Sequence, residues 1–124
     1  MLISSTADKP VALYHLVTAL LPKLAPGPAL CFTSSVDSTH RLYILLAALG
    51  LGERVAEFSG SLTAAKRAEL LSEFSRGNVQ LLICSDVMTR GMDLPSVAAV
   101  INYDVPQHLK TYVEVIPLWH FSFN

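Results

Sequence analysis

The chain has 124 residues, of which 52% are hydrophobic and 15% are charged, and its formal net charge is −1. This length corresponds to one domain, and the apolar fraction excludes an intrinsically disordered chain. A nearly neutral chain has no extended cationic surface, so any nucleic-acid site must be local and built from a few donors.

Hydrophobic periodicity predicts helices and strands in alternation along the first half of the chain. Apolar residues at spacings of three and four over residues 10–24 predict a first helix. Residues 29–32 form an apolar run without polar alternation, which is typical of a strand buried on both faces. The same helical spacing over residues 42–49 predicts a second helix that ends at Gly50. A shorter strand is predicted at residues 55–58.

The second half of the chain continues this alternation. Residues 64–74 predict a third helix, with Thr63 placed to cap its start and Gly77 to end it. Two more apolar runs, residues 80–84 and 97–101, predict further buried strands.

Strands that alternate with helices predict βαβ units with right-handed crossovers. The expected fold class is therefore α/β, with three layers and a mostly parallel sheet. Ligands bind such sheets at the carboxyl ends of the strands. Four loops should meet there, namely residues 33–37, 59–63, 85–93 and 104–108. We call this rim of the sheet the carboxyl-end edge.

The cysteines, the histidines and the hydropathy of the chain indicate its compartment and whether it binds a metal or a membrane. Cys31 and Cys84 lie inside apolar runs and are expected to be buried free thiols of a reducing compartment, with one disulfide as the alternative. The histidines are isolated in the sequence, so we expect no metal site. Neither a signal peptide nor an apolar stretch of about 20 residues is recognisable, and we expect an intracellular protein without a membrane partner.

The segment after the strand at residues 80–84 carries the most chemical information. It presents Ser85 and Asp86, then Arg90 beside Gly91, and then Asp93. Glycine lets the backbone approach a ligand, arginine binds phosphate through its fork, and aspartate can accept hydrogen bonds from ribose hydroxyls. An ordinary loop held by an Arg–Asp ion pair explains the same pattern equally well.

This segment resembles motif V of the DEAD-box RNA helicases, T-D-[VI]-x-[AS]-R-G-[IVL]-D, with Ser85 at the Thr position and Thr89 at the small residue. Four more segments are similar to the family in the same order. They are residues 30–35 (motif IV), 58–67 (H-G…Q-x-x-R), 100–106 (V-I-N-Y-D-x-P) and 111–113. The last of these segments resembles the run that leads into motif VI. The resemblance is to the nucleolar, ribosome-assembly branch, and it identifies residues 1–113 as a second RecA-like lobe.

The resemblance implies RNA contacts at five positions. These positions are Ser35, Gly60, Arg67, Ser85 and Asp86. The contacts would be made chiefly to phosphates, and Asp86 would shape its own loop. For Arg67, which lies between Lys66 and Glu69, a solvated ion-pair face is the alternative.

Nucleotide contacts are implied at Gly91 and Asp93, the latter accepting a hydrogen bond from ribose. Arg90 would link this lobe to a first RecA-like lobe near the γ-phosphate. ATP with Mg²⁺ is expected only in the context of that first lobe, since the chain contains neither a G-x-x-x-x-G-K-[ST] loop nor a D-E-A-D box.

Three positions depart from the family pattern within the matched region. Ala64 replaces the Gln of Q-x-x-R, Ser59 replaces the usual His before Gly60, and Val36 falls where many members carry Arg. We expect these changes to weaken RNA contact without abolishing it.

The tail, residues 114–124, departs completely. It matches none of the His, Gly or Arg positions of motif VI, H-R-x-G-R-x-x-R. An arginine finger contributes on the order of 10³–10⁵ in rate in related enzymes, so no complete catalytic site is expected and the isolated chain should have negligible ATPase activity. We also expect the sheet to lack its last strand, which leaves an edge unpaired unless the aromatic tail covers it.

Together these features predict the second lobe of an ATP-dependent RNA helicase of rRNA processing, located in the nucleus or nucleolus. Its expected partners are single-stranded or structured RNA, a first RecA-like lobe and pre-ribosomal proteins. The alternatives are a truncated or splice-variant RNA- or protein-binding module without a catalytic role, and a non-functional or dominant-negative fragment. A generic dinucleotide-binding or receiver-type domain is a further alternative, but it lacks its G-x-G-x-x-G loop or acidic pair.

Overall fold

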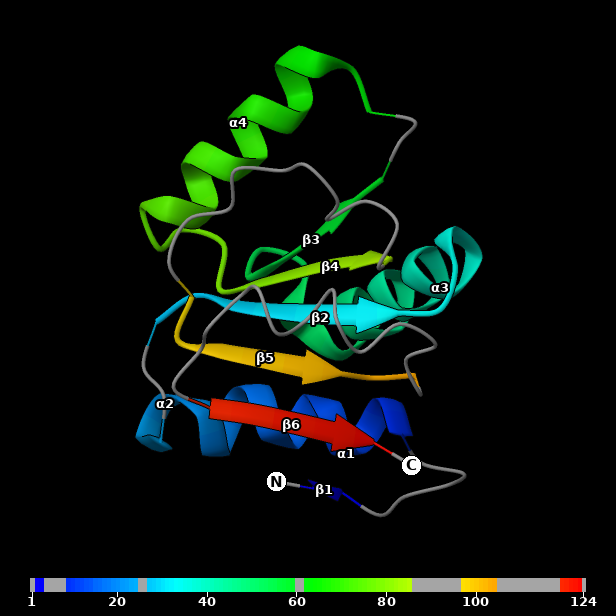
Figure 1. Cartoon of the computed structure of the whole chain (residues 1–124), viewed down its shortest axis with the longest axis vertical. Coiled ribbons are helices and arrows are strands. Elements are labelled where there is room, and N and C mark those ends of the chain that lie inside the picture. Colours follow the sequence, from blue (N-terminus) through cyan, green and yellow to red (C-terminus); the bar gives the residue numbers. More distant parts are fainter. Residues whose placement is uncertain are drawn as a thin grey trace.

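The apolar runs assemble into a parallel sheet in a computed structural model, which describes residues 2–3, 9–24, 27–59, 62–85, 97–104 and 119–123. Within these residues six strands follow the order β1-β6-β5-β2-β4-β3, and each neighbouring pair is parallel (Figure 1). The strands are β1 (Leu2–Ile3), β2 (Ala29–Thr33), β3 (Val55–Phe58), β4 (Leu81–Ser85), β5 (Ala99–Asn102) and β6 (Trp119–Phe123). The predicted parallel α/β sheet is confirmed.

Helices cover both faces of this sheet, which gives the three predicted layers. The helical elements are α1 (Lys9–His15), η1 (Leu16–Leu20), α2 (Leu21–Leu24), α3 (Val36–Leu46), η2 (Ala47–Leu51) and α4 (Ala64–Ser75). In Figure 1, α1 passes behind β6, whereas α4 lies next to β3. No helix in the described part of the chain is both long and apolar enough to cross a membrane.

The first helix, predicted over residues 10–24, is confirmed as one helical run. Its middle turn, η1, is a π-helical turn in which the Leu21 N–H donates to the carbonyl of Leu16, five residues back. The run buries Leu13, Leu16 and Val17 against the sheet.

The second helix begins earlier than its hydrophobic spacing predicts. Ser35 has an extended backbone (φ −154°, ψ 164°), and its side chain accepts a hydrogen bond from the Ser38 N–H, so α3 starts at Val36. Polar side chains in the first turns conceal this start in the sequence. The predicted end is confirmed, since Gly50 adopts φ +98° within η2 and breaks the helix there.

The third helix, α4, has the predicted caps at both ends. The Thr63 hydroxyl accepts a hydrogen bond from the Lys66 N–H at 3.1 Å. Gly77 follows the helix with φ +83°, a conformation that glycine adopts without strain.

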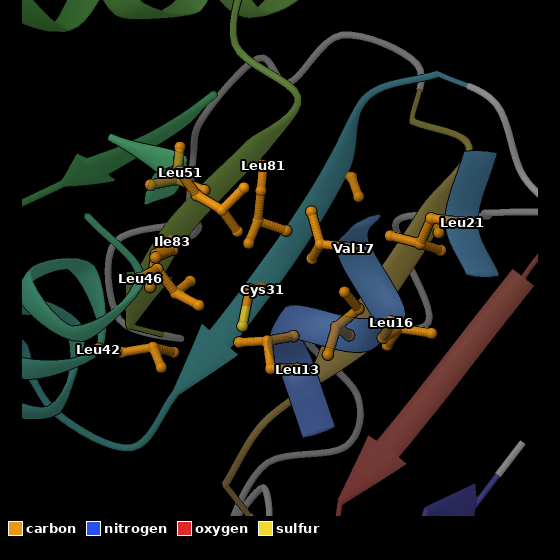
Figure 2. Packing of buried hydrophobic residues seen from close by; sticks show 14 residues of the cluster. Leu13, Leu16, Val17, Leu21, Cys31, Leu42, Leu46, Leu51, Leu81 and Ile83 are labelled. Atoms are coloured by element: carbon orange, nitrogen blue, oxygen red, sulfur yellow. The ribbon is translucent and has the colours of Figure 1, made fainter. Parts of the chain in front are cut away.

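Two hydrophobic clusters lie on opposite faces of the sheet, because side chains alternate along each strand. One cluster joins the sheet to α1 and α3 and contains Cys31 (Figure 2). The other joins the sheet to Phe74 of α4 and contains Cys84. Both cysteines are buried, as predicted. Burial is the main cause that raises the pKa of the Cys31 thiol, which keeps it protonated.

The sheet does not end at β5, because the tail covers this edge, which is the alternative stated above to an unpaired edge. Residues 119–123 form β6, which pairs with β5 in register (Ala99 opposite Trp119, Ile101 opposite Phe121) and with β1 on its other side. The physical reason is that the backbone groups along the edge of β5 need hydrogen-bond partners, and the tail alternates aromatic with polar residues as a strand does. The boundary expected at residues 113 and 114 lies outside the described residues.

Candidate nucleic-acid interface

The carboxyl-end edge forms where the parallel strands end together. Thr33 ends β2 and Ser85 ends β4, and the two residues lie opposite each other in the register of these neighbouring strands. Side chains that lie opposite each other in a parallel pair point to the same face. The Thr33 and Ser85 hydroxyls therefore lie side by side, on the face covered by α3.

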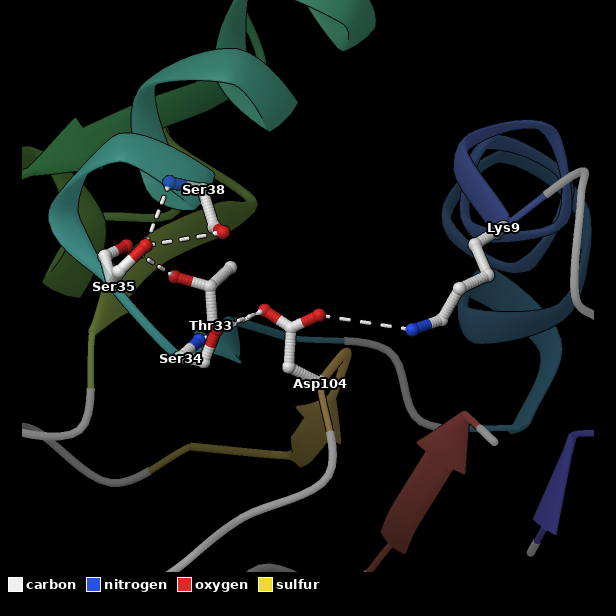
Figure 3. Close-up of polar contacts among 6 residues, drawn as sticks. All are labelled: Lys9, Thr33, Ser34, Ser35, Ser38 and Asp104. Carbon is white, nitrogen blue, oxygen red and sulfur yellow. Dashed lines mark hydrogen bonds and ion pairs between the residues drawn. The ribbon is translucent and has the colours of Figure 1, made fainter.

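The N-terminus of α3 opens onto this edge. The Ser35 hydroxyl accepts from the Ser38 N–H at 3.1 Å and donates to the Ser38 hydroxyl at 3.1 Å (Figure 3). Ser35 is exposed. An α-helix N-terminus combines free N–H donors with the positive end of the helix dipole, so it favours an anion.

A buried hydroxyl pair fixes the loop between β2 and α3. The Oγ1 atoms of Thr33 and Thr39 are 2.6 Å apart, and each lies 3.0 Å from the carbonyl oxygen of Ser35. Both threonines are at most 2% exposed. Their hydroxyls are satisfied internally, so they hold the Ser35 backbone instead of serving a ligand.

Asp104, which follows β5, holds the same loop from the outside. Its Oδ2 accepts from the Ser34 N–H at 2.8 Å and from the Ser34 hydroxyl at 3.1 Å, and its Oδ1 is 3.7 Å from the Lys9 ammonium (Figure 3). Neither Asp104 nor Lys9 is among the site residues that the sequence predicts. The available signal was an aspartate directly after a buried strand, in the segment that resembles V-I-N-Y-D-x-P.

Lys9 is also held by the ring of Tyr103. Its ammonium lies 4.8 Å from the ring centroid, within the range of a cation–π contact. Burial raises the pKa of Tyr103 to about 12, and Cys31 and Asp104 add to this shift. The phenol therefore stays neutral at physiological pH.

Ser85 differs from the threonines, because its buried hydroxyl has no partner within the described residues. The residue is 3% exposed, and its Oγ forms no hydrogen bond there. An unsatisfied buried hydroxyl costs about 1–3 kcal/mol, so a ligand that bonds to it regains that energy. Asn102, which ends β5, has a similarly unsatisfied Oδ1.

Arg67 lies on α4, on the stripe that also carries Leu70, Leu71 and Phe74 towards the sheet. Its Nε is buried without a partner in the described part of the chain. Lys66 and Glu69 pair with each other at 3.6 Å. The alternative of a solvated ion-pair face fits Lys66 and Glu69 but not the buried Nε of Arg67.

Ser35, Arg67 and Ser85 are thus the predicted site residues that the structure describes. Five others lie outside the described residues, namely Gly60, Asp86, Arg90, Gly91 and Asp93. Within the described ranges no group of three or more His, Cys, Asp or Glu side chains could hold a metal ion. What these ranges offer is a helix N-terminus, a free hydroxyl and a guanidinium, which are donors for an anionic ligand.

Comparison with known proteins places these features in a wider context. Residues 8–116 match the model of the helicase conserved C-terminal domain. The chain is 45% identical over 107 residues to the ATP-dependent RNA helicase DDX51 of Mus musculus, covering 86% of this chain and 16% of the relative. It is 43% identical over 94 residues to the ATP-dependent rRNA helicase rrp3 of Botryotinia fuckeliana, covering 76% of this chain and 19% of the relative.

A solved structure of similar fold is domain 2 of the DEAD-box helicase Mss116p, bound to an RNA duplex. It superposes with a TM-score of 0.75 at 26% identity, covering 98% of this chain and 52% of that one. The chain therefore spans less than a fifth of the two sequence relatives and about half of this structure.

Proposed function

Because the chain belongs to the DEAD-box RNA helicases, as their C-terminal RecA-like lobe, we propose that its carboxyl-end edge binds RNA through the phosphates. The observation that carries this proposal is the buried, unsatisfied Ser85 hydroxyl beside the capped N-terminus of α3. A phosphate oxygen accepts hydrogen bonds from both donors and is attracted by the helix dipole. The net charge of −1 agrees with a local site of this kind.

The RNA-binding positions of the proposal are Ser35, Gly60, Arg67, Ser85 and Asp86. Ser35 and Arg67 approach from two different helices, α3 and α4, and Ser85 supplies a hydroxyl from the sheet between them. Contacts of this kind position RNA and carry no base sequence. The solved domain 2 of Mss116p, bound to an RNA duplex, supports binding by a single lobe.

ATP with Mg²⁺ enters the proposal only in the whole helicase, where it would lie between this lobe and a first RecA-like lobe. Gly91 and Asp93 are assigned to the nucleotide, and Arg90 to the link between the lobes. ATP would supply the energy that drives cycles of RNA binding and release. The isolated chain should have negligible ATPase activity, and measurable RNA-stimulated turnover by the purified chain would refute this assignment.

The biological setting in the proposal is rRNA processing in the nucleus or nucleolus. Its support is the rRNA helicase name of one relative and the similarity to DDX51. Pre-ribosomal proteins and the first lobe would be the protein partners.

The proposal can be tested by fluorescence anisotropy of the purified chain with labelled single-stranded and duplex RNA. Ser85→Ala removes one phosphate donor and should raise the Kd at least about 10-fold, as expected for one hydrogen bond to a charged group. Ser75→Ala is the matched control, because this exposed serine ends α4 near the opposite rim of the sheet. Absence of RNA binding, or equal effects of the two substitutions, would reject the proposal.

The mismatched tail favours a second candidate, an RNA- or protein-binding module without a catalytic role. Fusing residues 1–124 to a first lobe, with and without a restored motif VI, separates the candidates. A helicase lobe should show RNA-stimulated ATPase activity only after restoration, and its RNA affinity should depend on the nucleotide. Nucleotide-independent RNA binding in both fusions would support the binding module.

A further inference from the structure

The carboxylate of Asp104 joins two loops that are far apart in the sequence. It follows β5, and it accepts two hydrogen bonds from Ser34, 70 positions earlier. The bond from the Ser34 N–H, at 2.8 Å, is a charge-assisted hydrogen bond to the backbone. A backbone bond fixes the path of the chain itself, whereas a bond to a mobile side chain would not.

This path leads directly into the cap of α3. On the inner side of the loop, the Thr33 and Thr39 hydroxyls lie 2.6 Å apart, and both are near the Ser35 carbonyl. On the outer side, Asp104 holds Ser34 (Figure 3). The Ser35 hydroxyl and the free N–H groups of α3 are therefore aimed by contacts on both sides of the loop.

Lys9 compensates for the charge of this carboxylate. Its ammonium lies 3.7 Å from Asp104 Oδ1, and the other oxygen, Oδ2, faces Ser34. An uncompensated carboxylate near a phosphate would repel it. The Tyr103 ring, 4.8 Å from the ammonium, helps to hold Lys9 at this position.

We propose that Asp104 is a positioning residue for the RNA-phosphate site: it aims the N-terminus of α3 through Ser34, with Lys9 offsetting its charge, and does not itself touch RNA. This inference rests on the proposed RNA-binding function. A positioning role requires an oxygen at position 104 that accepts the hydrogen bond from the Ser34 N–H, but it does not require a negative charge there. Substitutions can separate the effect of the acceptor from the effect of the charge.

Three variants of the full chain separate them. Asp104→Ala removes the acceptor and should raise the RNA Kd about 5-fold, less than the loss of a direct charge-assisted hydrogen bond, because Asp104 does not itself touch RNA. Asp104→Asn keeps an oxygen for the Ser34 N–H and should stay within about 2-fold of wild type. Asp104→Glu keeps the charge but displaces it by one methylene, so it should also weaken binding.

The matched control is Glu73→Ala. Glu73 accepts from the Asn78 amide at 2.7 Å and pairs with Arg76 at 3.8 Å, so the same types of contact are lost away from the carboxyl-end edge. This variant should leave the RNA Kd unchanged even if its melting temperature falls. Hydrogen exchange provides a direct readout, because protection of the Ser34 amide should be lost in Asp104→Ala and retained in Asp104→Asn.

Salt dependence distinguishes positioning from direct contact. The slope of log Kd against log salt reports the number of phosphates neutralised, and it should be the same in Asp104→Ala as in wild type. The inference is overturned if Asp104→Ala and Asp104→Glu bind RNA as tightly as wild type, or if Asp104→Asn is as weak as Asp104→Ala. If Asp104→Ala does not fold, the Asn and Glu variants decide alone.

If the wild-type chain binds no RNA, the proposed function fails and this inference fails with it. If Ser85→Ala weakens RNA binding but the Asp104 variants do not, only this inference fails and the proposed function stands.

Discussion

At the scale of single residues, the carboxyl-end edge separates structural hydroxyls from available ones. Thr33 and Thr39 satisfy each other, whereas Ser85 is buried without a partner within the described residues. All three are hydroxyl residues on the same face, so residue type alone does not distinguish their roles. The difference lies in whether a second donor or acceptor is within reach, because buried polar groups usually find partners.

Arg67 provides a test of direct phosphate contact at this scale. Arg67→Met keeps a long apolar side chain but removes the guanidinium, so the Kd for RNA should rise. The slope of log Kd against log salt should decrease by about 0.7, the contribution of one neutralised phosphate on single-stranded RNA. Anisotropy titrations at several salt concentrations measure both quantities.

The control for Arg67 is Arg76→Met, because Arg76 follows α4 and pairs with Glu73 at 3.8 Å on an exposed surface. It removes the same charge at the far end of the helix. A slope that falls equally in both variants would mean that net charge, and not a contact by Arg67, controls RNA affinity.

Tyr103 predicts a change of stability at alkaline pH. Its folded-state pKa is raised to about 12 from an ordinary value of 10.0, chiefly by burial. Above pH 10 the unfolded chain therefore loses this proton before the folded chain does, so stability present below pH 10 is lost as pH rises towards 12. Melting temperatures between pH 9 and 12 should fall less steeply in Tyr103→Phe than in wild type. Parallel curves would contradict the prediction, with Tyr43→Phe as the control.

Site residues can be predicted from the sequence where they belong to one short segment, but not where they depend on a contact between distant segments. Ser35, Arg67 and Ser85 could be selected because each lies in a short segment with a recognisable order of residue types. The bond between Asp104 and Ser34 could not, since it requires β5 to lie beside β2, and the sheet order is a property of the folded chain. Lys9 was missed for the same reason.

At the scale of elements, helix ends are set by backbone chemistry more than by hydrophobic spacing. Gly50 and Gly77 were recognised as helix stops because a positive φ favours glycine wherever the chain reverses. The start of α3 was misplaced because its first turn is polar and the Ser35 cap only becomes visible with the loop conformation. The tail was expected to cover the sheet edge only as an alternative, because it matches no motif of the family, although its alternation of aromatic and polar residues is typical of a strand.

Gly50 and Gly52 form a matched pair for testing this view. Gly50 adopts φ +98°, and no atom of the described residues lies within 4 Å of an added Cβ. Gly50→Ala therefore tests backbone strain and should lower the free energy of unfolding by about 1–2 kcal/mol. Gly52 has φ −57°, and an added Cβ would lie 3.6 Å from the Ala47 Cβ, an ordinary contact. Gly52→Ala should therefore be neutral or slightly stabilising. Urea unfolding of both variants provides the measurement, and an equal loss in both would argue against strain at Gly50.

At the scale of the whole molecule, the sheet edge that we propose to bind RNA is a different one from the edge that the tail closes. The carboxyl-end edge carries the donors for a ligand, and the lateral edge beyond β5 is closed by β6 and then β1. The strand β5 pairs with β2 on one side and with β6 on the other, so β6 leaves no unpaired backbone edge on the strand that Asp104 follows. The tail, residues 114–124, which interrupts the family pattern, therefore contributes a strand to the fold.

Breaking β6 should consequently affect the assembly state as well as stability. Phe121→Pro removes one backbone donor inside a strand that has neighbours on both sides, and the loss should lower the free energy of unfolding by at least about 1 kcal/mol. Phe121→Val is the control, because it keeps the N–H and replaces one residue that favours strands with another. An unpaired β5 edge would be open to pairing with a second chain, so the proline variant should form dimers or larger species in light-scattering chromatography while the valine variant keeps the wild-type state. If the proline variant matched wild type in both stability and mass, β6 would not be part of the folded sheet in solution.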